Sequence, residues 1–294
     1  MTFATHFVPV RDGKLTVAEW ADGKRPLLAI HGLSSTHKLW LWTVASLKGY
    51  HVIAPDLRGR GGSQGFRDYG MRHNRDDMIA VLDHFGLDKV TLLGMSLGGF
   101  IAADLAAAHP KRIDRLMLVD GGIPFANAAA MKKMSREQIV GSFADRFGRI
   151  ERPWPSYEAY RDFFLGATGP LLDRDDPLLE EYLRYDLVGA EPELRVRLDG
   201  AAMAADSADL YLDGRADEAA AKVKAPTRLL YAQWSIGRDS PPGYTGEYLQ
   251  PWLPRIRAFK ATLLPGTDHA ATVMSDASGQ AIARELDILA HLPD

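Results

Sequence analysis

The most constraining stretch of the sequence is the pentapeptide Gly94-Met95-Ser96-Leu97-Gly98, which stands between a predicted strand and a predicted helix. The apolar run over residues 90–93 predicts a buried strand, and the apolar segment over residues 100–109 predicts a helix. A G-x-S-x-G sequence in that setting forms a tight turn that holds the serine hydroxyl out of the sheet. The alternative is an ordinary turn whose serine caps the helix. The setting favours Ser96 as a nucleophile.

Apolar strands and helical segments alternate from residue 26 to residue 119. Such alternation is typical of a parallel sheet with helices on both faces. The strand segments are short apolar runs without polar alternation, which indicates strands buried on both sides. An Asp12-Gly13 turn predicts an antiparallel hairpin ahead of the sheet, and further strands are predicted at 228–232 and 261–264. The fold class is therefore α/β, with a mostly parallel central sheet.

The alternation stops between residues 123 and 224. This stretch has several helical segments rich in Ala, Leu, Arg and Glu, no clear apolar strand, and many aromatic residues. We expect a helical lid, or cap, over residues 123–224, inserted into a core formed by residues 1–122 and 225–294. The acidic run at 173–176 is expected to be a solvated loop at the start of a helix rather than a metal site.

The composition limits the possible classes of function. The chain has 294 residues, 46% of them hydrophobic and 25% charged, which indicates a soluble globular protein with a large core. A net charge of -3 without any concentration of Lys or Arg argues against nucleic-acid and membrane-surface partners. The absence of cysteine excludes disulfides, thiolate metal sites and a cysteine nucleophile. The first residues lack the features of a signal peptide, so we expect a cytoplasmic monomer or homodimer.

A serine hydroxyl becomes a good nucleophile when an imidazole accepts its proton and a carboxylate orients that imidazole. Of nine histidines, His269 lies in a glycine-rich loop after the last predicted strand, where a chain order of serine, acid and histidine requires it. His51 is expected to be a hydrogen-bonded core residue. Other histidines are expected to be structural, namely His6, His37, His73, His84, His109 and His291.

The glycine-rich run at residues 58–62 lacks the Lys-Ser/Thr ending of a phosphate-binding loop and does not match a dinucleotide-binding turn. It is predicted to be a structural turn braced by Asp56 and Arg58. No histidine pair has the i, i+4 spacing of a helix-borne zinc site. We therefore expect neither a cofactor nor a metal ion.

Five motifs resemble, in their order, those of α/β-hydrolase-fold enzymes with a helical cap, and they cover nearly the full length of the chain. They lie at residues 31–33, 56–63, 94–99, 118–120 and 266–269. The resemblance implies a serine hydrolase similar to carboxylesterases and lactonases. Haloalkane dehalogenases and epoxide hydrolases share this fold, but they need an aspartate in place of Ser96. Met95 departs from the family, in which a histidine often precedes the serine; we expect altered packing rather than an altered mechanism.

The acid of the predicted triad has two candidates. Family members commonly carry it about nine residues after a Pro-Thr pair like Pro226-Thr227, where this chain has Ser235. Some members carry it instead at the end of the strand before the lid, which corresponds to Asp120. Asp239 is the alternative, in a loop that would have to follow a longer path. We favour Asp120 because it directly follows its strand, although a cap on the first turn of the lid would also explain it.

Acyl transfer also needs donors for the oxyanion, usually two backbone N–H groups. Leu97, directly after the nucleophile, is expected to supply one. The resemblance implies that Leu33, after His31-Gly32, supplies the other. We expect an apolar pocket between the sheet edge and the lid. The side chains expected near the substrate are Leu33, Met95, Leu97, Phe125 and Trp234.

These residues predict hydrolysis of a carboxylic ester or lactone through an acyl-enzyme on Ser96, with His269 as base and Asp120 as orienting acid. The expected partner is a small, mostly apolar substrate. The same triad could instead hydrolyse a carbon–carbon bond in a diketone, a thioester or a small amide. A protein of a different class, a ligand sensor with slow turnover, is the remaining alternative.

Overall fold

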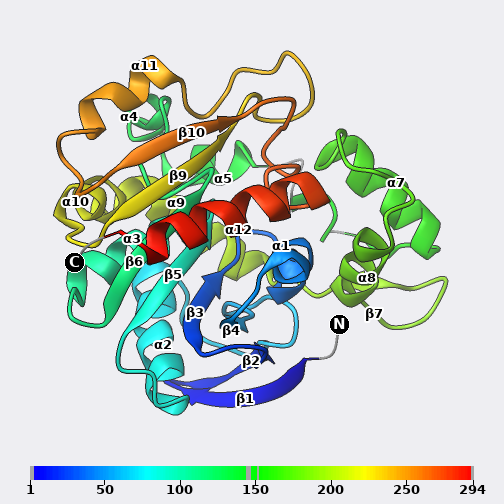
Figure 1. Ribbon diagram of the computed structural model, residues 1–294. Helices are drawn as coiled ribbons and strands as arrows, with labels where there is room; N and C mark the ends of the chain where they lie inside the picture. Colours follow the sequence, from blue (N-terminus) through cyan, green and yellow to red (C-terminus); the bar gives the residue numbers. More distant parts are fainter. Residues whose placement is uncertain (1–2, 144–146, 151, 293–294) are drawn as a thin grey trace.

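An eight-stranded sheet forms the centre of the computed structural model, which describes residues 3–143, 147–150 and 152–292 (Figure 1). The strand order is β1-β2-β4-β3-β5-β6-β9-β10. The pairs β1–β2 and β2–β4 are antiparallel, and all other neighbours are parallel, which confirms the predicted mostly parallel sheet. The strands are β1 (Ala4–Val10), β2 (Gly13–Trp20), β3 (Arg25–Ile30), β4 (Tyr50–Pro55), β5 (Val90–Met95), β6 (Ile113–Val119), β9 (Thr227–Ala232) and β10 (Lys260–Leu264).

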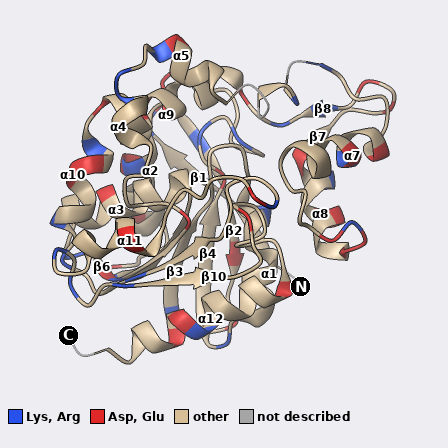
Figure 2. Ribbon diagram, turned by 90° about the horizontal axis from the view of Figure 1, so that it is seen from above, with Lys and Arg blue, Asp and Glu red and all other residues tan. Residues whose placement is uncertain are grey.

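Helices cover both faces of this sheet. On one face α1 (Leu41–Ser46), which follows the short helix η1 (His37–Trp40), packs against α12 (Asp276–Ala290) (Figures 1 and 2). On the other face α2 (Met71–His84) packs against α3 (Leu97–Ala108), which contacts β5 and β6. The α3 segment is buried along most of its length, which explains its apolar sequence. No helix within the described ranges is long and apolar enough to cross a membrane.

The chain between β6 and β9 is mainly helical. Its helices are α4 (Ala128–Met131), α5 (Arg136–Gly141), α7 (Tyr157–Ala167), α8 (Pro177–Asp186), α9 (Gly200–Leu212) and α10 (Arg215–Lys222). The expectation of no strand here is wrong at one place, because β7 (Leu187–Val188) and β8 (Arg195–Val196) form an antiparallel hairpin. Strands of two residues are too short to show an alternation of apolar and polar residues in the sequence. The acidic run precedes α8 as predicted, and Asp176 caps that helix. Two short helices also lie between β9 and β10, namely α11 (Gly246–Leu249) and η2 (Gln250–Trp252).

The loop that leaves β3 is fixed by a buried, neutral histidine. The backbone N–H of Leu57 donates to Nε2 of His31 at 2.9 Å, so the ring proton is on Nδ1, which donates to the Gly32 carbonyl at 2.8 Å. Burial lowers the pKa of His31 to about 4. The Gly32 carbonyl and the Leu33 N–H belong to one peptide plane, so this bond also fixes the direction of the Leu33 N–H.

Asp56 holds the glycine-rich turn after β4. It also links this turn to the insertion, which is the mainly helical chain between β6 and β9. Its carboxylate accepts hydrogen bonds from the Nδ1 and the backbone N–H of His37, from the Gly62 N–H and from the Tyr185 hydroxyl of α8. Burial acts to raise the pKa of Asp56, but the charge and hydrogen bond of His37 outweigh it and hold the pKa at about 2. The predicted brace is completed by Arg58, which pairs with Asp77 at 2.5 Å.

The packing of α12 against α1 depends on Gly279. A Cβ at this position would lie 2.3 Å from the carbonyl oxygen of Trp42, whereas a Cβ at Gly166 in α7 would meet open space. We predict that Gly279→Ala lowers the free energy of unfolding by about 1–3 kcal/mol through overpacking. Gly166→Ala should be neutral or raise it by about 0.5–1 kcal/mol because alanine favours the helix. Urea denaturation measures both; equal effects of the two changes would contradict the close packing.

The neutral His31 predicts a specific acid sensitivity. Its folded pKa of about 4 lies below the ordinary value of 6.5, so the unfolded chain binds the proton first as the pH falls. The stability that neutral His31 contributes is complete above pH 6.5 and is lost between pH 6.5 and about 4, a change of about 3 kcal/mol. His31→Asn keeps a donor for the Gly32 carbonyl but does not titrate. The variant should show a flatter dependence of unfolding free energy on pH in this window, and a slope as steep as that of the wild type would contradict this role of His31.

Candidate active site

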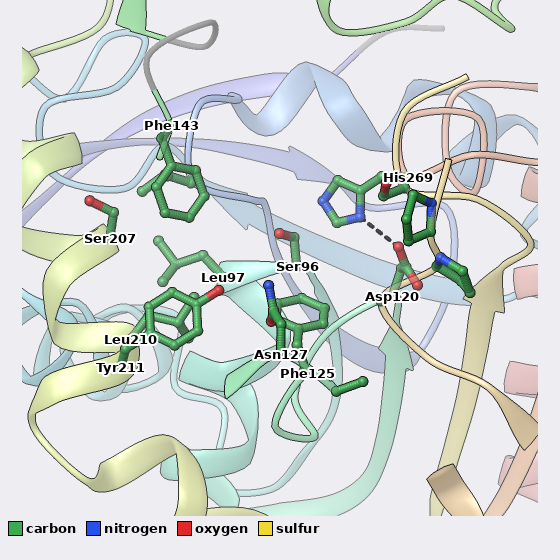
Figure 3. A pocket seen from close by; sticks show the side chains of 16 residues that line it. Ser96, Leu97, Asp120, Phe125, Asn127, Phe143, Ser207, Leu210, Tyr211 and His269 are labelled. Atoms are coloured by element: carbon green, nitrogen blue, oxygen red, sulfur yellow. Dashed lines mark hydrogen bonds and ion pairs between the residues drawn. The ribbon is translucent and has the colours of Figure 1, made fainter. Parts of the chain in front are cut away.

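Ser96 sits on a strained turn between β5 and α3. Its backbone has φ 53° and ψ -123°, a conformation that residues other than glycine rarely adopt. Close packing enforces the turn: a Cβ on Gly98 would lie 2.0 Å from the Ile30 carbonyl oxygen, and one on Gly94 would lie 2.4 Å from the Gly98 carbonyl oxygen. The pentapeptide therefore forms the predicted strand–turn–helix, with the Ser96 side chain directed to a cavity (Figure 3).

Asp120 and His269 meet beside Ser96. Nδ1 of His269 lies 2.6 Å from Oδ2 of Asp120, and the dashed line in Figure 3 marks this bond. The other carboxylate oxygen, Oδ1, accepts from the backbone N–H of Ala232 at 3.1 Å. Asp120 is buried and has a left-handed backbone with φ 43°. Its backbone N–H donates to the Leu230 carbonyl at 2.8 Å, so β9 holds the acid from two sides.

The alternative acid lies elsewhere. Asp239 is exposed in the loop after β9, and in the described part of the chain no hydrogen bond joins its side chain to His269. Ser235, at the usual family position, accepts from the His269 backbone N–H through its carbonyl at 3.2 Å and lines the cavity. Asp268 turns away from the imidazole and accepts from the backbone N–H groups of Gly237 and Ala271. The geometry thus brings Asp120, rather than Asp239, to the imidazole.

The two expected oxyanion donors border the same cavity. Leu97 is the first residue of α3, so its N–H has no acceptor within the helix. The N–H of Leu33 takes its direction from the peptide plane that His31 holds through Gly32. Leu33, Ser96 and Leu97 all line the cavity. Both residues therefore lie beside the serine, where acyl transfer needs its donors.

Ser96 and His269 lie between two cavities. The larger, of about 590 Å³, is lined by core residues and by residues of the insertion, among them Phe143, Ser207 and Tyr211. The smaller, of about 50 Å³, lies beyond Leu33 and is lined by side chains that include Met95, Phe164 and Met274. No Lys or Arg among the described residues lines either cavity. Both spaces are mostly apolar around the serine.

Two of the side chains expected near the substrate divide between these cavities, and a third lines neither. Phe125 lines the larger cavity and Met95 the smaller one. Trp234 lines neither cavity, so its expected contact with substrate stays a prediction. Its backbone N–H donates to the Thr267 carbonyl, and the Arg238 guanidinium lies over its ring at 5.5 Å.

Four polar residues line the larger cavity although the sequence did not predict this position for them: Asn127, Ser207, Tyr211 and Ser235. A signal existed for two of them. Ser207, Leu210 and Tyr211 have the i, i+3, i+4 spacing of one face of α9, and all three line the cavity (Figure 3). Asn127 and Ser235 are in loops, where no periodicity marks an inward side chain. Within the described ranges no group of three or more His, Asp or Glu side chains could hold a metal ion.

Curated proteins similar to this chain include hydrolases. The chain is 28% identical over 168 residues to lipase LipV of Mycobacterium tuberculosis (strain ATCC 25618 / H37Rv), which covers 57% of this chain and 59% of that protein. It is 37% identical over 109 residues to 2-hydroxymuconate semialdehyde hydrolase of Pseudomonas sp. (strain CF600), which covers 34% of this chain and 38% of that protein. The chain thus spans about three fifths or less of the length of these curated relatives.

Solved structures extend the likeness in fold to nearly the whole chain. The structure of E-2-(acetamidomethylene)succinate hydrolase has a TM-score of 0.78 at 20% identity and covers 97% of this chain and 100% of that one. A thermophilic esterase from Thermogutta terrifontis has a TM-score of 0.68 at 23% identity, with 98% and 99% covered. The family described as alpha/beta hydrolase fold matches residues 25–174. This chain belongs to the α/β hydrolase fold family.

Proposed function

We propose that this protein hydrolyses carboxylic esters or lactones through an acyl-enzyme on Ser96. The observation that carries the proposal is the bond between His269 and Asp120 beside a serine on a strained strand–helix turn. This is the arrangement that activates a hydroxyl for acyl transfer. The name of one relative, a lipase, and of one structural neighbour, an esterase, supports the same chemistry.

In the proposed acylation, Ser96 Oγ attacks the ester carbonyl while Nε2 of His269 accepts its proton. Because Nδ1 donates to Asp120 at 2.6 Å, its proton is fixed on that side and Nε2 is left as the base. The carboxylate stabilises the imidazolium that forms. The imidazolium then returns the proton to the leaving alcohol, and the carbon–oxygen bond of the ester breaks.

The carbonyl oxygen becomes negative in the tetrahedral intermediate, and the N–H groups of Leu33 and Leu97 are proposed to bind it. Water deacylates the enzyme in the second half of the reaction, with His269 again as the base. Each backbone donor of this kind contributes roughly 3 kcal/mol of transition-state stabilisation. No metal ion or organic cofactor has a part in these steps.

The lining of the cavities supports an uncharged, mostly apolar substrate. In the described residues neither cavity presents a Lys or Arg side chain that would neutralise a carboxylate. The larger cavity, of about 590 Å³, is within the range of small-molecule sites. We also propose that residues 123–224 act as a lid, since Phe143, Ser207 and Tyr211 face Ser96 across this cavity.

One observation favours carbon–carbon bond hydrolysis as a second candidate. The chain is 37% identical to 2-hydroxymuconate semialdehyde hydrolase over the 109 residues that match. The same serine, histidine and oxyanion donors would serve that reaction. A substrate that carries a carboxylate would, however, find no cationic side chain among the described residues that line the cavities. We therefore favour hydrolysis of esters or lactones over carbon–carbon bond hydrolysis.

A substrate panel with a serine-directed probe tests the proposed function. We predict that the wild type hydrolyses p-nitrophenyl esters or lactones in a panel that varies acyl length, and that a fluorophosphonate labels Ser96. Ser96→Ala should lose both labelling and at least about 10³-fold in kcat. A diketone with a cleavable carbon–carbon bond and an acyl thioester complete the panel. Retained ester turnover in Ser96→Ala would refute the acyl-enzyme, and tight ligand binding with negligible turnover across the panel would favour a sensor.

A matched pair of substitutions tests the acid. Asp120→Asn removes the charge opposite His269, so we predict a fall in kcat on the order of 10³- to 10⁴-fold. Asp239→Asn makes the same chemical change at an exposed position and should leave kcat within about twofold. Steady-state kinetics on the best ester, with the thermal midpoint of each variant as a control for folding, measure the difference. A larger loss of kcat from Asp239→Asn than from Asp120→Asn would show that Asp239, in the loop after β9, is the acid.

A further inference from the structure

Two buried arginines hold the loop that carries the proposed oxyanion donor Leu33. Nε of Arg60 donates to the Leu33 carbonyl at 2.9 Å, and Nη2 of Arg149 donates to the next carbonyl, that of Ser34. Arg60 is 0% exposed and Arg149 is 1% exposed. His31 holds the preceding carbonyl, that of Gly32. Buried side chains therefore hold three successive carbonyl groups of the loop.

Arg149 belongs to the insertion, and so do its side-chain partners Asp186 and Tyr160. Its Nη1 lies 3.2 Å from Oδ2 of Asp186, at the end of α8, and donates to the hydroxyl of Tyr160 in α7 at 3.0 Å. The Tyr160 hydroxyl donates in turn to the same Asp186 oxygen at 2.6 Å. Asp186 is 0% exposed. A closed, charged hydrogen-bond network of the insertion thus ends on a backbone group next to the catalytic centre.

Arg149 lines neither cavity. It would therefore act on the reaction through the loop rather than by contact with substrate. A buried ion pair is in general weak evidence for stability, because desolvation offsets the attraction between its members. What such a network does provide is a fixed direction for the groups it bonds, which is the property that preorganised oxyanion donors need.

We propose that Arg149, held by Asp186 and Tyr160, is a positioning residue for the Leu33 N–H donor. The insertion then contributes to the rate of acyl transfer as well as to the shape of the pocket. This inference rests on the proposed serine-hydrolase function. Misplacement of a donor costs rate more than ground-state binding, since the negative oxygen exists only in the transition state and the tetrahedral intermediates.

The test uses the double variant Arg149→Met/Asp186→Asn, which removes both charges and so leaves no unpaired ion. We expect kcat for a p-nitrophenyl ester to fall on the order of 10- to 100-fold, with KM within about threefold. An alkyl trifluoromethyl ketone is the second readout. Ser96 Oγ adds to its carbonyl, His269 takes the proton, and the resulting alkoxide needs the same donors. Its inhibition constant should rise by about the same factor as kcat falls.

The matched control is Arg58→Met/Asp77→Asn, which removes a similarly buried ion pair. In this pair Nε of Arg58 lies 2.5 Å from Oδ2 of Asp77. Arg58 donates to the carbonyls of Asp68 and Arg11, which lie outside the oxyanion loop. This variant should lose stability while kcat and the inhibition constant stay within about threefold. Tyr160→Phe keeps the Arg149–Asp186 pair and serves if the double variant fails to fold; it should lose about 3- to 10-fold in kcat, with a parallel rise in the inhibition constant.

Several outcomes would overturn the proposal. A folded Arg149→Met/Asp186→Asn protein with wild-type kcat and inhibition constant refutes the positioning role, and so does a rise in KM alone. Equal kinetic losses in the Arg58→Met/Asp77→Asn control would mean that general loosening of the fold causes the effect. In all of these outcomes the wild type still hydrolyses the ester and binds the ketone. A wild-type protein that does neither refutes the proposed function itself, and the positioning role with it.

Discussion

The backbone strain at Ser96 is the constraint around which the site is built. A non-glycine residue with φ 53° costs of the order of 1–3 kcal/mol and persists only where its surroundings leave no alternative. Here the start of α3 lies so close to β3 that Gly98 has no room for a Cβ beside the Ile30 carbonyl. Relaxing the turn would therefore require the helix to move off the sheet, and the buried apolar surface of α3 opposes that movement. The core thus holds the serine in place.

The loop after β3 is held differently, by buried polar groups from both the core and the insertion. His31 and Arg60 fix two of its carbonyls from the core side, and Arg149 fixes a third from the insertion. The insertion is tied to the same region by Tyr185 of α8, which donates to Asp56. Any displacement of α8 would disturb the groups that orient the Leu33 peptide. If residues 123–224 act as a lid, α8 is best suited to be a fixed part of it.

Much of the core was predictable from sequence, and the reasons are local. Each predicted feature has a signal in consecutive residues. Apolar runs indicate the strands of the sheet, the glycine pattern indicates the turn at Ser96, and His269 follows the last strand. The hairpin β7–β8 is too short for such a signal. The roles of Arg60 and Arg149 were not predictable either, because each bonds a backbone carbonyl 27 or 115 residues away in the chain. The direction of Trp234 was not predictable for a related reason, since loop side chains follow no period.

The position of the acid shows how the sheet allows the proposed triad to be rearranged. β6 and β9 are parallel neighbours, and Val119 at the end of β6 pairs with Leu230 of β9. Their carboxyl ends therefore lie at one edge, within reach of the loop that carries His269. A carboxylate at the end of β6 therefore reaches the imidazole from the neighbouring strand, as Asp120 does. In this chain Asp120 also accepts from the Ala232 N–H, so the neighbouring strand supports it directly. The position after β9 is then free for a small side chain, and Ser235 there lines the larger cavity. With Asp120 as the proposed acid, the position after β9 is available to line the proposed substrate pocket.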